Sequence, residues 1–358
     1  MRPTVRMEDN ASDARIHLTM LPFKLVYSDH YRFPIGEHVF PTRKYEMVHD
    51  ELLEEGIATA HDFVAPTPAT EADILLVHSH FYVDKLIEGT LSAREELQME
   101  IPYSYEAVQG FLWHTGGSIL AAEKALADGV GFNLGGGFHH AFPDHGEGFC
   151  MIHDVAVAIR KLQKSGQIRR AMALDCDVHQ GNGTAVIFGA REQTQTDPLP
   201  SRSASTIGDR SGGNMIERGA TDVFTISLHQ ENNYPLSKAS SSIDVNLPDG
   251  IGDADYLSWL DNALSSGLRQ FEPELICYIA GADPYKEDQL GGLNLTIEGL
   301  MRRDELVFQA ARARQIPVMV TFAGGYSKRI YDTVRIHRNT VAAAHQVFAT
   351  VGKRAAKS

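Results

Sequence analysis

Short apolar runs recur along the chain, and segments with a helical spacing of apolar residues lie between most of them. Such runs, rich in aliphatic and β-branched residues and bounded by Gly, Pro or Asp, are typical of buried parallel strands. The predicted strands are residues 24–27, 74–77, 130–134, 171–174, 223–228, 275–280 and 318–322. The predicted helices are residues 105–127, 154–164, 253–271, 297–314 and 335–351. This alternation predicts a single-domain α/β fold, in which helices flank a doubly wound, mostly parallel sheet.

The composition excludes several classes of protein. Of 358 residues, 43% are hydrophobic and 22% are charged, which is typical of a globular chain. Lys and Arg number 33 against 46 Asp and Glu, so the net charge of −13 argues against direct nucleic-acid binding and favours cationic substrates or partners. The three cysteines, Cys150, Cys176 and Cys277, are too few for a disulfide framework and are expected to be buried thiols.

The ends of the chain and one internal segment differ from the rest. No apolar run reaches the ~18 residues of a membrane span, and the N-terminus lacks the apolar core of a secretory signal. We therefore expect a cytoplasmic protein with no membrane association. Residues 1–20 are predicted to be a mobile extension and 21–352 a single domain. Residues 191–220, rich in Ser, Thr, Gly, Pro and Arg, are predicted to be a surface insertion, either a disordered loop or a lid.

Glycines and polar side chains follow four of the predicted strands. These segments are GGGFHH (135–140), DCDVHQGNG (175–183), GAD (281–283) and AGGY (323–326). Because ligands of open α/β sheets bind at the carboxyl ends of the strands, the four segments predict one site. A dinucleotide-binding loop does not fit the glycines, since Leu134 stands where the third glycine is required.

The pattern Asp175-x-Asp177-x-His179 is suited to holding a cation. Residues two apart on an extended chain point to the same side, so these side chains can converge. A mixture of aspartate and histidine suits zinc or another first-row divalent metal, and Asp283 is a candidate third ligand. The alternative is a helix cap or loop cluster without a metal.

Three further side chains fit hydrolytic chemistry. Beside a metal, His139 and His140 would supply a general base and a general acid, with Asp175 and Asn182 as candidate partners for their far nitrogens. Tyr326 could donate a hydrogen bond to a developing oxyanion. Otherwise the histidines are structural and the tyrosine is a packed aromatic. Together with a metal, these residues predict metal-assisted amide hydrolysis.

Five segments resemble motifs of the histone deacetylase superfamily, in the family's order. They are GGGFHHAFPDHGEGFC, DCDVHQGNGTAVIF, SLHQENNYP, AGADPYKEDQLGGLNLT and FAGGYSKR. The early segment HVFPTRKYEMVHDELLEEG is similar to the bacterial, class IV-like branch, and the resemblance runs from about residue 22 to about residue 345. It implies the arginase/deacetylase fold and a zinc-dependent deacylase acting on an N-acylated amine, with acetyl-lysine as the favoured substrate.

The resemblance also implies roles for individual residues. One zinc ion per chain would be held by Asp177, His179 and Asp283. Catalysis would involve His139, His140 as the general base, Tyr326, Asp175 and Asn182. A structural potassium ion would be held by Asp175, Asp177, His179, Ser227 and Leu228. The walls of an acyl-lysine tunnel would include Gly148, Phe149 and Tyr234.

The sequence departs from the family pattern at two positions and in the insertion 191–220, which is longer than expected in this branch and bears on the rim and the substrate. Asn182 stands where other classes carry Asp, which removes a charge beside His140 and is expected to lower the basicity of that histidine. His153 stands where the family commonly has Asn, and the sequence does not predict its effect.

Three alternative functions remain open at this point. A deacetylase of acetylated polyamines or similar small cations would require an acid at the tunnel rim, for which Glu231 is a candidate. A two-manganese ureohydrolase of the same fold would require a second carboxylate cluster, whereas only Asp288 lies near Asp283 in the sequence. An inactive acyl-lysine binding module is the third alternative. The oligomeric state is not predicted.

Overall fold

The computed structural model describes residues 20–189 and 222–349. The predicted N-terminal extension, apart from residue 20, and the predicted insertion 191–220 lie outside the described residues. Their roles and the domain limits 21–352 therefore stay predictions. Within the described ranges, no helix is long and apolar enough to cross a membrane.

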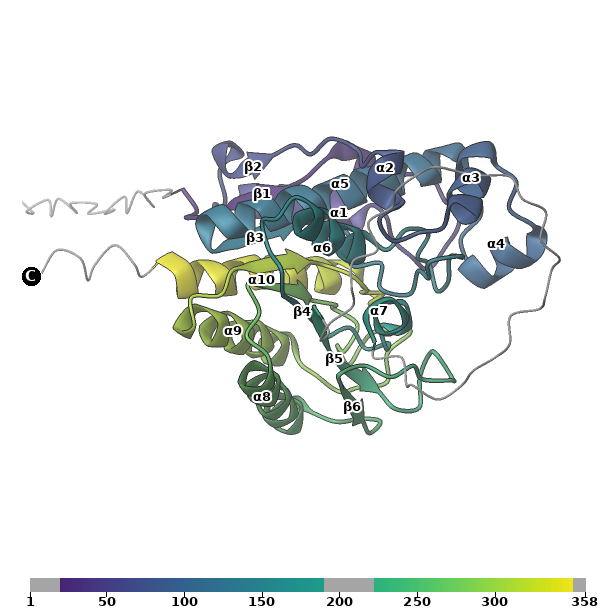
Figure 1. Ribbon diagram of the computed structural model, residues 1–358. Coiled ribbons are helices and arrows are strands. Elements are labelled where there is room, and N and C mark those ends of the chain that lie inside the picture. The colour runs from purple at the N-terminus through teal and green to yellow at the C-terminus, as the bar shows by residue number, and fades with distance from the viewer. Residues whose placement is uncertain (1–19, 190–221, 350–358) are drawn as a thin grey trace, which may run out of the picture.

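A parallel sheet forms the centre of the molecule (Figure 1). In the described part of the chain it has eight strands in the order β2-β1-β3-β8-β7-β4-β5-β6, and neighbouring strands all pair in parallel. The strands are β1 (Lys24–Val26), β2 (Phe63–Val64), β3 (Val130–Asn133), β4 (Ala171–Asp175), β5 (Val223–Gln230), β6 (Ile243–Leu247), β7 (Leu275–Ile279) and β8 (Val318–Thr321). The predicted doubly wound parallel sheet is confirmed.

Helices cover both faces of this sheet. Figure 1 shows α8, α9 and α10 together on one side and α5 and α6 on the other. The helices are α1 (Lys44–Glu54), α2 (Glu71–Ile74), α3 (His80–Glu88), α4 (Ala93–Met99), α5 (Tyr105–Asp128), α6 (Asp154–Lys164), α7 (Asn182–Phe188), α8 (Asp253–Gln270), α9 (Ile297–Ala313) and α10 (Ile330–Phe348).

The central strands are buried on both faces, which explains their continuous apolar sequences. On β7, Ile276 and Tyr278 pack into the core beneath α8, α9 and α10. Cys277 and Ile279 point the other way, into the core beneath α5 and α6. All three cysteines are buried free thiols, as predicted. These two cores pack against opposite faces of the central strands.

Local signals define the predicted helix α5. The Ser104 hydroxyl accepts a hydrogen bond from the Ala107 N–H at 3.0 Å and caps the first turn. The helix ends at Gly129, whose left-handed φ of 87° is the conformation that glycine adopts readily at a helix end. Between these caps, α5 packs along β3 and leads directly into the strand before the histidine pair.

Some predicted elements were wrong. Residues 74–77 form the end of α2 and a following turn rather than a strand. The Thr70 N–H and hydroxyl both donate to Asp73 Oδ2, at 3.0 and 2.7 Å, and this capping box starts the short helix. The sequence did not predict the edge strands β2 and β6 or the helices α1, α3, α4 and α7. The last helix begins at Ile330, five residues before the predicted start at 335.

Candidate metal centre and active site

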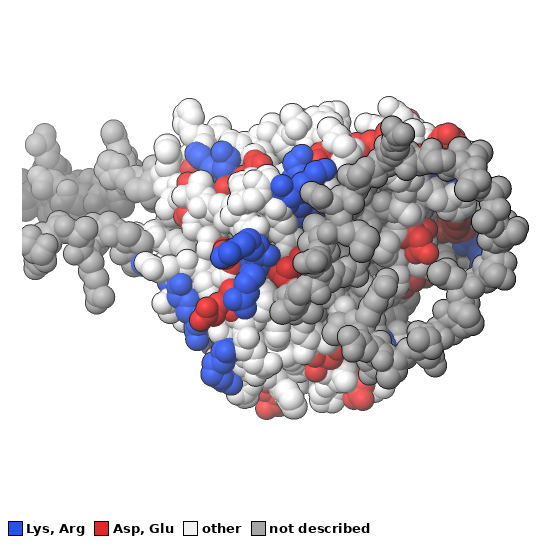
Figure 2. Space-filling view, viewed as in Figure 1, with Lys and Arg blue, Asp and Glu red and all other residues white. Residues whose placement is uncertain are grey.

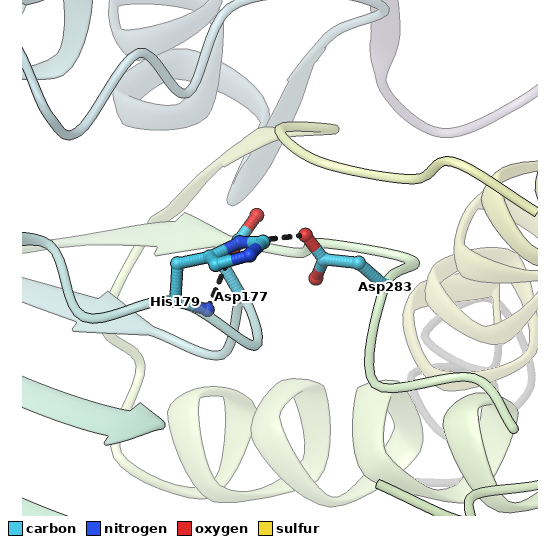
Figure 3. A group of neighbouring side chains, drawn as sticks. All are labelled: Asp177, His179 and Asp283. Carbon is cyan, nitrogen blue, oxygen red and sulfur yellow. Dashed lines mark hydrogen bonds and ion pairs between the residues drawn. The ribbon is translucent and has the colours of Figure 1, made fainter. Parts of the chain in front are cut away.

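Three metal-ligating side chains meet at the carboxyl ends of β4 and β7. Asp177 and His179 follow β4, and Asp283 follows β7; all three are buried. One ligand atom from each lies within 4.8 Å of the others. His179 Nδ1 is 3.1 Å from Asp177 Oδ1 and 3.4 Å from Asp283 Oδ2, and Figure 3 shows the side chains pointing toward one another. The structure thus brings together the three residues predicted as metal ligands.

Backbone hydrogen bonds hold this group in place. Asp283 Oδ1 accepts from the Val178 N–H at 2.8 Å, and Asp177 Oδ2 accepts from the Gly324 N–H at 2.9 Å. The loops after β4, β7 and β8 are therefore joined through the two carboxylates. Gly324 has to be glycine because a Cβ at this position would overlap Asp283 Oδ2.

The donor set fits a divalent cation. Asp283 Oδ2 is buried and has no hydrogen-bond partner among the described residues. Burial and the nearby Asp177 carboxylate raise the pKa of Asp283 to about 7. Burial alone would lower the pKa of His179, but its hydrogen bond to Asp177 and its ion pair with Asp283 raise it to about 10. Two carboxylates and one imidazole, with a buried oxygen that accepts no hydrogen bond from the described residues, are the ligand types and number of a catalytic zinc site.

The histidine pair lies beside this group. The loop that carries it is fixed by Asp154, which accepts hydrogen bonds from the Gly137 N–H at 3.0 Å and the Phe138 N–H at 2.8 Å. The imidazole centroids of His139 and His140 are 4.0 Å apart. Asp154 also stands at the start of α6, so that helix supports the loop.

Each histidine has the partner that the sequence suggested. His139 Nδ1 donates to Asp175 Oδ2 at 2.6 Å, and His140 Nδ1 donates to Asn182 Oδ1 at 2.7 Å. Burial would lower the pKa of His139, but Asp175 and Asp177 raise it to about 9. The pKa of His140 lies well below its usual range because of burial and the nearby His139 and His179; its hydrogen bond to Asn182 acts in the opposite direction.

A cavity of about 190 Å³ opens onto the metal-ligand group and the histidines. The predicted tunnel residues Gly148, Phe149 and Tyr234 all line it, as does Tyr326. The Tyr234 ring meets His140 edge-on at 5.0 Å, and the Phe149 ring lies 5.8 Å from Tyr326. Gly148 has a φ of 51°, and a Cβ there would lie 2.8 Å from His140 Cδ2, so both backbone and packing favour glycine.

The residues predicted for a potassium ion lie at the carboxyl end of the β4–β5 pair. Asp175 pairs with Ser227 in the strand register, and Leu228 follows on β5. Ser227 Oγ lies 2.9 Å from His229 Nδ1, and Asp175 Oδ1 accepts from the Asp177 N–H at 3.1 Å. The potassium ion itself stays a prediction.

His153, whose effect the sequence did not predict, caps helix α6. Its Nδ1 accepts from the Ala156 N–H at 3.2 Å, so its Nε2 carries the proton and donates to Thr184 Oγ1 at 2.9 Å. Its own N–H donates to His78 Nε2 at 3.0 Å. His153 therefore links α6, which supports the histidine loop, to α7, which carries Asn182.

The sequence analysis missed three charged residues around the cavity. Lys44 is fully buried, donates to the Ala323 carbonyl at 2.6 Å, and has its pKa lowered to about 8 by burial. Glu100 is exposed and lines the cavity, and Glu147 accepts a hydrogen bond from the lining residue Tyr234. Glu231, the acid considered for the rim, is not among the residues that line it. Glu147 and Lys44 both lay in quoted segments, where nothing singled them out, and Glu100 lay outside every quoted segment.

The fold matches that of solved structures. The chain superposes on solved structures titled as an HDAC homolog complexed with SAHA and an HDAC homolog from Aquifex aeolicus, with TM-scores of 0.71 and 0.69. The structure with SAHA is 24% identical in sequence, and the match covers 90% of this chain and 84% of that one. The Aquifex aeolicus structure is 23% identical, and the match covers 91% of this chain and 88% of that one. The architecture is the arginase/deacetylase fold.

Sequence comparison then identifies the family. The family model for the histone deacetylase domain matches residues 38–342, so the chain belongs to the histone deacetylase family. It is 32% identical to histone deacetylase 2 of Arabidopsis thaliana, over 81% of this chain and 70% of that one. An uncharacterized protein of Picosynechococcus sp. is 38% identical over 91% of this chain and 99% of its own. Family membership supports deacetylase activity.

Proposed function

We propose that this chain is a zinc-dependent deacylase that hydrolyses the amide of an N-acylated amine, with acetyl-lysine as the favoured substrate. The observation that carries the proposal is the convergence on one cavity of a buried Asp–His–Asp group, two hydrogen-bonded histidines and a buried tyrosine. In this proposal Asp177, His179 and Asp283 hold one zinc ion. A zinc ion there would supply Lewis acidity, which polarises an acyl carbonyl and acidifies a water molecule.

The side chains around the cavity would perform the proton transfers. Because Asn182 Oδ1 can only accept, the hydrogen-bonded Nδ1 of His140 carries a proton, which leaves Nε2 of the neutral ring free. His140 Nε2 would accept a proton from water as the oxygen attacks the carbonyl carbon. The Tyr326 hydroxyl would donate a hydrogen bond to the carbonyl oxygen as negative charge develops there. One of the two histidines would then protonate the leaving nitrogen as the C–N bond breaks.

The remaining cavity walls would hold the substrate stem. Phe149 and Tyr234 would offer apolar ring surfaces to a narrow methylene chain, beside Gly148, which lets the backbone lie close to His140. The proposal is tested by amine release from acetyl-lysine and octanoyl-lysine peptides, with zinc-loaded and chelator-treated protein. Turnover that is lost on chelation supports the proposal, and turnover unaffected by chelation overturns its metal dependence.

A small acetylated cation is a second candidate substrate, favoured by one observation. The exposed residue Glu100 lines the cavity, and an acid at its edge would attract a free ammonium group on the substrate. Competition between acetylputrescine and an acetyl-lysine peptide decides between the two. If acetylputrescine has the higher kcat/KM, the small cation is the preferred substrate class.

A two-manganese ureohydrolase is not favoured. Among the described residues, Asp177, His179 and Asp283 are the one group of side chains that could hold a metal ion. Asp288, the carboxylate considered with Asp283 from the sequence, accepts hydrogen bonds from the N–H groups of Tyr326 and Leu290, at 2.7 and 2.8 Å. Its role is to fix the loop that carries the tyrosine.

A further inference from the structure

The carboxylate that supports His140 is separated from it by one residue. His139 donates directly to the Asp175 carboxylate at 2.6 Å. His140 instead donates to the amide oxygen of Asn182 at 2.7 Å, and the Asn182 amide nitrogen donates to Glu147 Oε1 at 2.6 Å. The order of contacts is therefore His140, Asn182, Glu147, and Glu147 is the first group in this chain of contacts that carries a negative charge.

The chemistry of the three groups fixes the direction of every hydrogen bond. An amide has a donor nitrogen and an acceptor oxygen, whereas an ionised carboxylate only accepts. Glu147 therefore selects the Asn182 orientation in which nitrogen faces the carboxylate and oxygen faces His140. The N–H of Gly183 donates to the same Asn182 oxygen at 3.1 Å and favours the same orientation. The imidazole then carries its proton on Nδ1 and keeps Nε2 free.

The two oxygens of Glu147 have different partners. Oε1 faces inward and also accepts from the Tyr234 hydroxyl at 2.7 Å. Oε2 faces outward, where Gln98 Nε2 lies at 3.3 Å and His145 Nε2 at 3.5 Å. The Glu147 side chain is 16% exposed; its bonds to Asn182 and Tyr234 are partly buried, whereas its bond to Gln98 is exposed. Burial would raise the pKa of Glu147, but bonds from these neighbours lower it to about 2 and keep it ionised.

We propose that Glu147 is a positioning residue that sets the tautomer of His140 through the Asn182 amide and holds the Tyr234 wall on the same oxygen. The inference deepens the proposed function and rests on it where activity is measured. It also explains how this chain works with an amide at position 182. The carboxylate of Glu147 contacts the Asn182 amide instead of His140 itself. The orientation that Glu147 imposes on this amide determines which nitrogen of His140 carries the proton.

The test compares two variants of Glu147 with a control. Glu147→Leu removes both acceptor oxygens, while Glu147→Gln keeps one acceptor but lets its amide turn. Gln98→Ala is the matched control, because it removes a contact only to the outward oxygen. We expect Glu147→Leu to lower kcat roughly 10- to 100-fold, the range for loss of a group that orients an active-site imidazole. The kcat of Glu147→Gln should lie between those of Glu147→Leu and the natural chain, and the kcat of Gln98→Ala should stay within about twofold of the natural value.

The tautomer is read independently of activity. Long-range proton–nitrogen NMR of the zinc-loaded protein, labelled with ¹⁵N-histidine, distinguishes a protonated Nδ1 from a protonated Nε2. The His140 signal is assigned by its loss in His140→Phe. We expect Nδ1–H in the natural chain and a mixture or the opposite tautomer in Glu147→Leu. If the natural chain hydrolyses no tested amide, the proposed function fails, yet the NMR comparison still decides the role of Glu147.

Two outcomes would overturn the inference. One is a folded Glu147→Leu protein with natural kcat and an unchanged His140 tautomer. The other is a loss of activity in Glu147→Leu that Gln98→Ala reproduces, because this would trace the effect to general disturbance of the loop. If Glu147→Leu does not fold, as judged by thermal melting, Glu147→Gln carries the same comparison, with an unchanged tautomer and kcat as the negative result.

Discussion

Replacing Tyr326 with phenylalanine isolates the contribution of one hydroxyl group. The backbone at this residue is held by Asp288 Oδ2, which accepts from its N–H at 2.7 Å, and by Gln289, which donates to its carbonyl at 2.8 Å. The ring packs against Phe149. None of these contacts involves the hydroxyl, so Tyr326→Phe should keep the ring where it is. The variant therefore removes a single proposed oxyanion donor from the cavity.

The expected decrease in kcat follows from the free energy that one such donor contributes to the transition state. Removal of one hydrogen bond to a developing oxyanion costs about 3–4 kcal/mol, or about 100- to 1,000-fold in kcat. Because the bond strengthens only in the transition state, KM should change much less than kcat. Folding should change by about 1 kcal/mol or less, which thermal melting checks.

The assay is steady-state amine release from an acetyl-lysine peptide by zinc-loaded protein. Tyr331→Phe is the matched control, because Tyr331 lies on α10 with 67% of its surface exposed and outside the cavity lining. A kcat for Tyr326→Phe within about threefold of the natural chain would exclude the oxyanion role. An equal loss in Tyr331→Phe would point to a general effect on the protein.

Three other substitutions test separate parts of the structure. His140→Ala should lower kcat by about two orders of magnitude or more through loss of the general base; a natural rate in steady-state assays would reject that role. Gly148→Ala should lower kcat/KM by about tenfold or more, because its Cβ would lie 2.8 Å from His140. Gly250→Ala is the matched control, since its φ is also positive, at +72°, but its Cβ would meet nothing within 4 Å; equal losses in both would exclude a steric cause. Hydrogen bonds from Lys85 and Ser92 lower the pKa of Glu95 to about 2, below its ordinary 4.5. Ionised Glu95 therefore stabilises the fold fully above the ordinary pKa, and this stabilisation is lost as the pH falls through about 2. The unfolding free energies of the natural chain and Glu95→Gln should thus differ at pH 6 and converge near pH 2, and a difference independent of pH would contradict the assignment.

The face of the molecule in Figure 2 bears on the expected partners. Lys and Arg side chains there are interspersed with Asp and Glu over the described surface, rather than gathered into one broad basic area. This agrees with the net charge of −13. The absence of direct nucleic-acid binding stays a prediction, which a filter-binding measurement at low salt would test.

The sheet and the metal-ligand group were predictable because their signals are local. Buried parallel strands are continuous apolar runs, and the polar segments follow four of them directly. The sequence predicted that these segments form one site, but not that their strands are neighbours, which the strand order β3-β8-β7-β4 establishes. The two edge strands were not predicted because their sequences lack the continuous apolar runs of buried strands. β2 has two residues, and β6 alternates apolar and polar residues because only part of it is buried.

The contacts around the cavity were less predictable, because they join distant parts of the chain. Lys44 reaches a carbonyl 279 residues away, and nothing around it in the sequence marks a buried lysine. Glu147 lies in a recognisable motif, but its importance depends on Asn182 and Tyr234, which come from two other segments. Residues 74–77 illustrate the opposite error, since a short apolar run alone does not distinguish a strand from a buried helix end.

Titration of the metal-free protein with zinc, followed by amine release from an acetyl-lysine peptide, tests whether one metal ion held by Asp177, His179 and Asp283 supports hydrolysis. We predict that turnover rises with added zinc and reaches its plateau at one ion per chain. Asp283→Asn should raise the zinc concentration required. Full turnover without metal, or a plateau only at two ions per chain, would contradict a single-zinc deacylase.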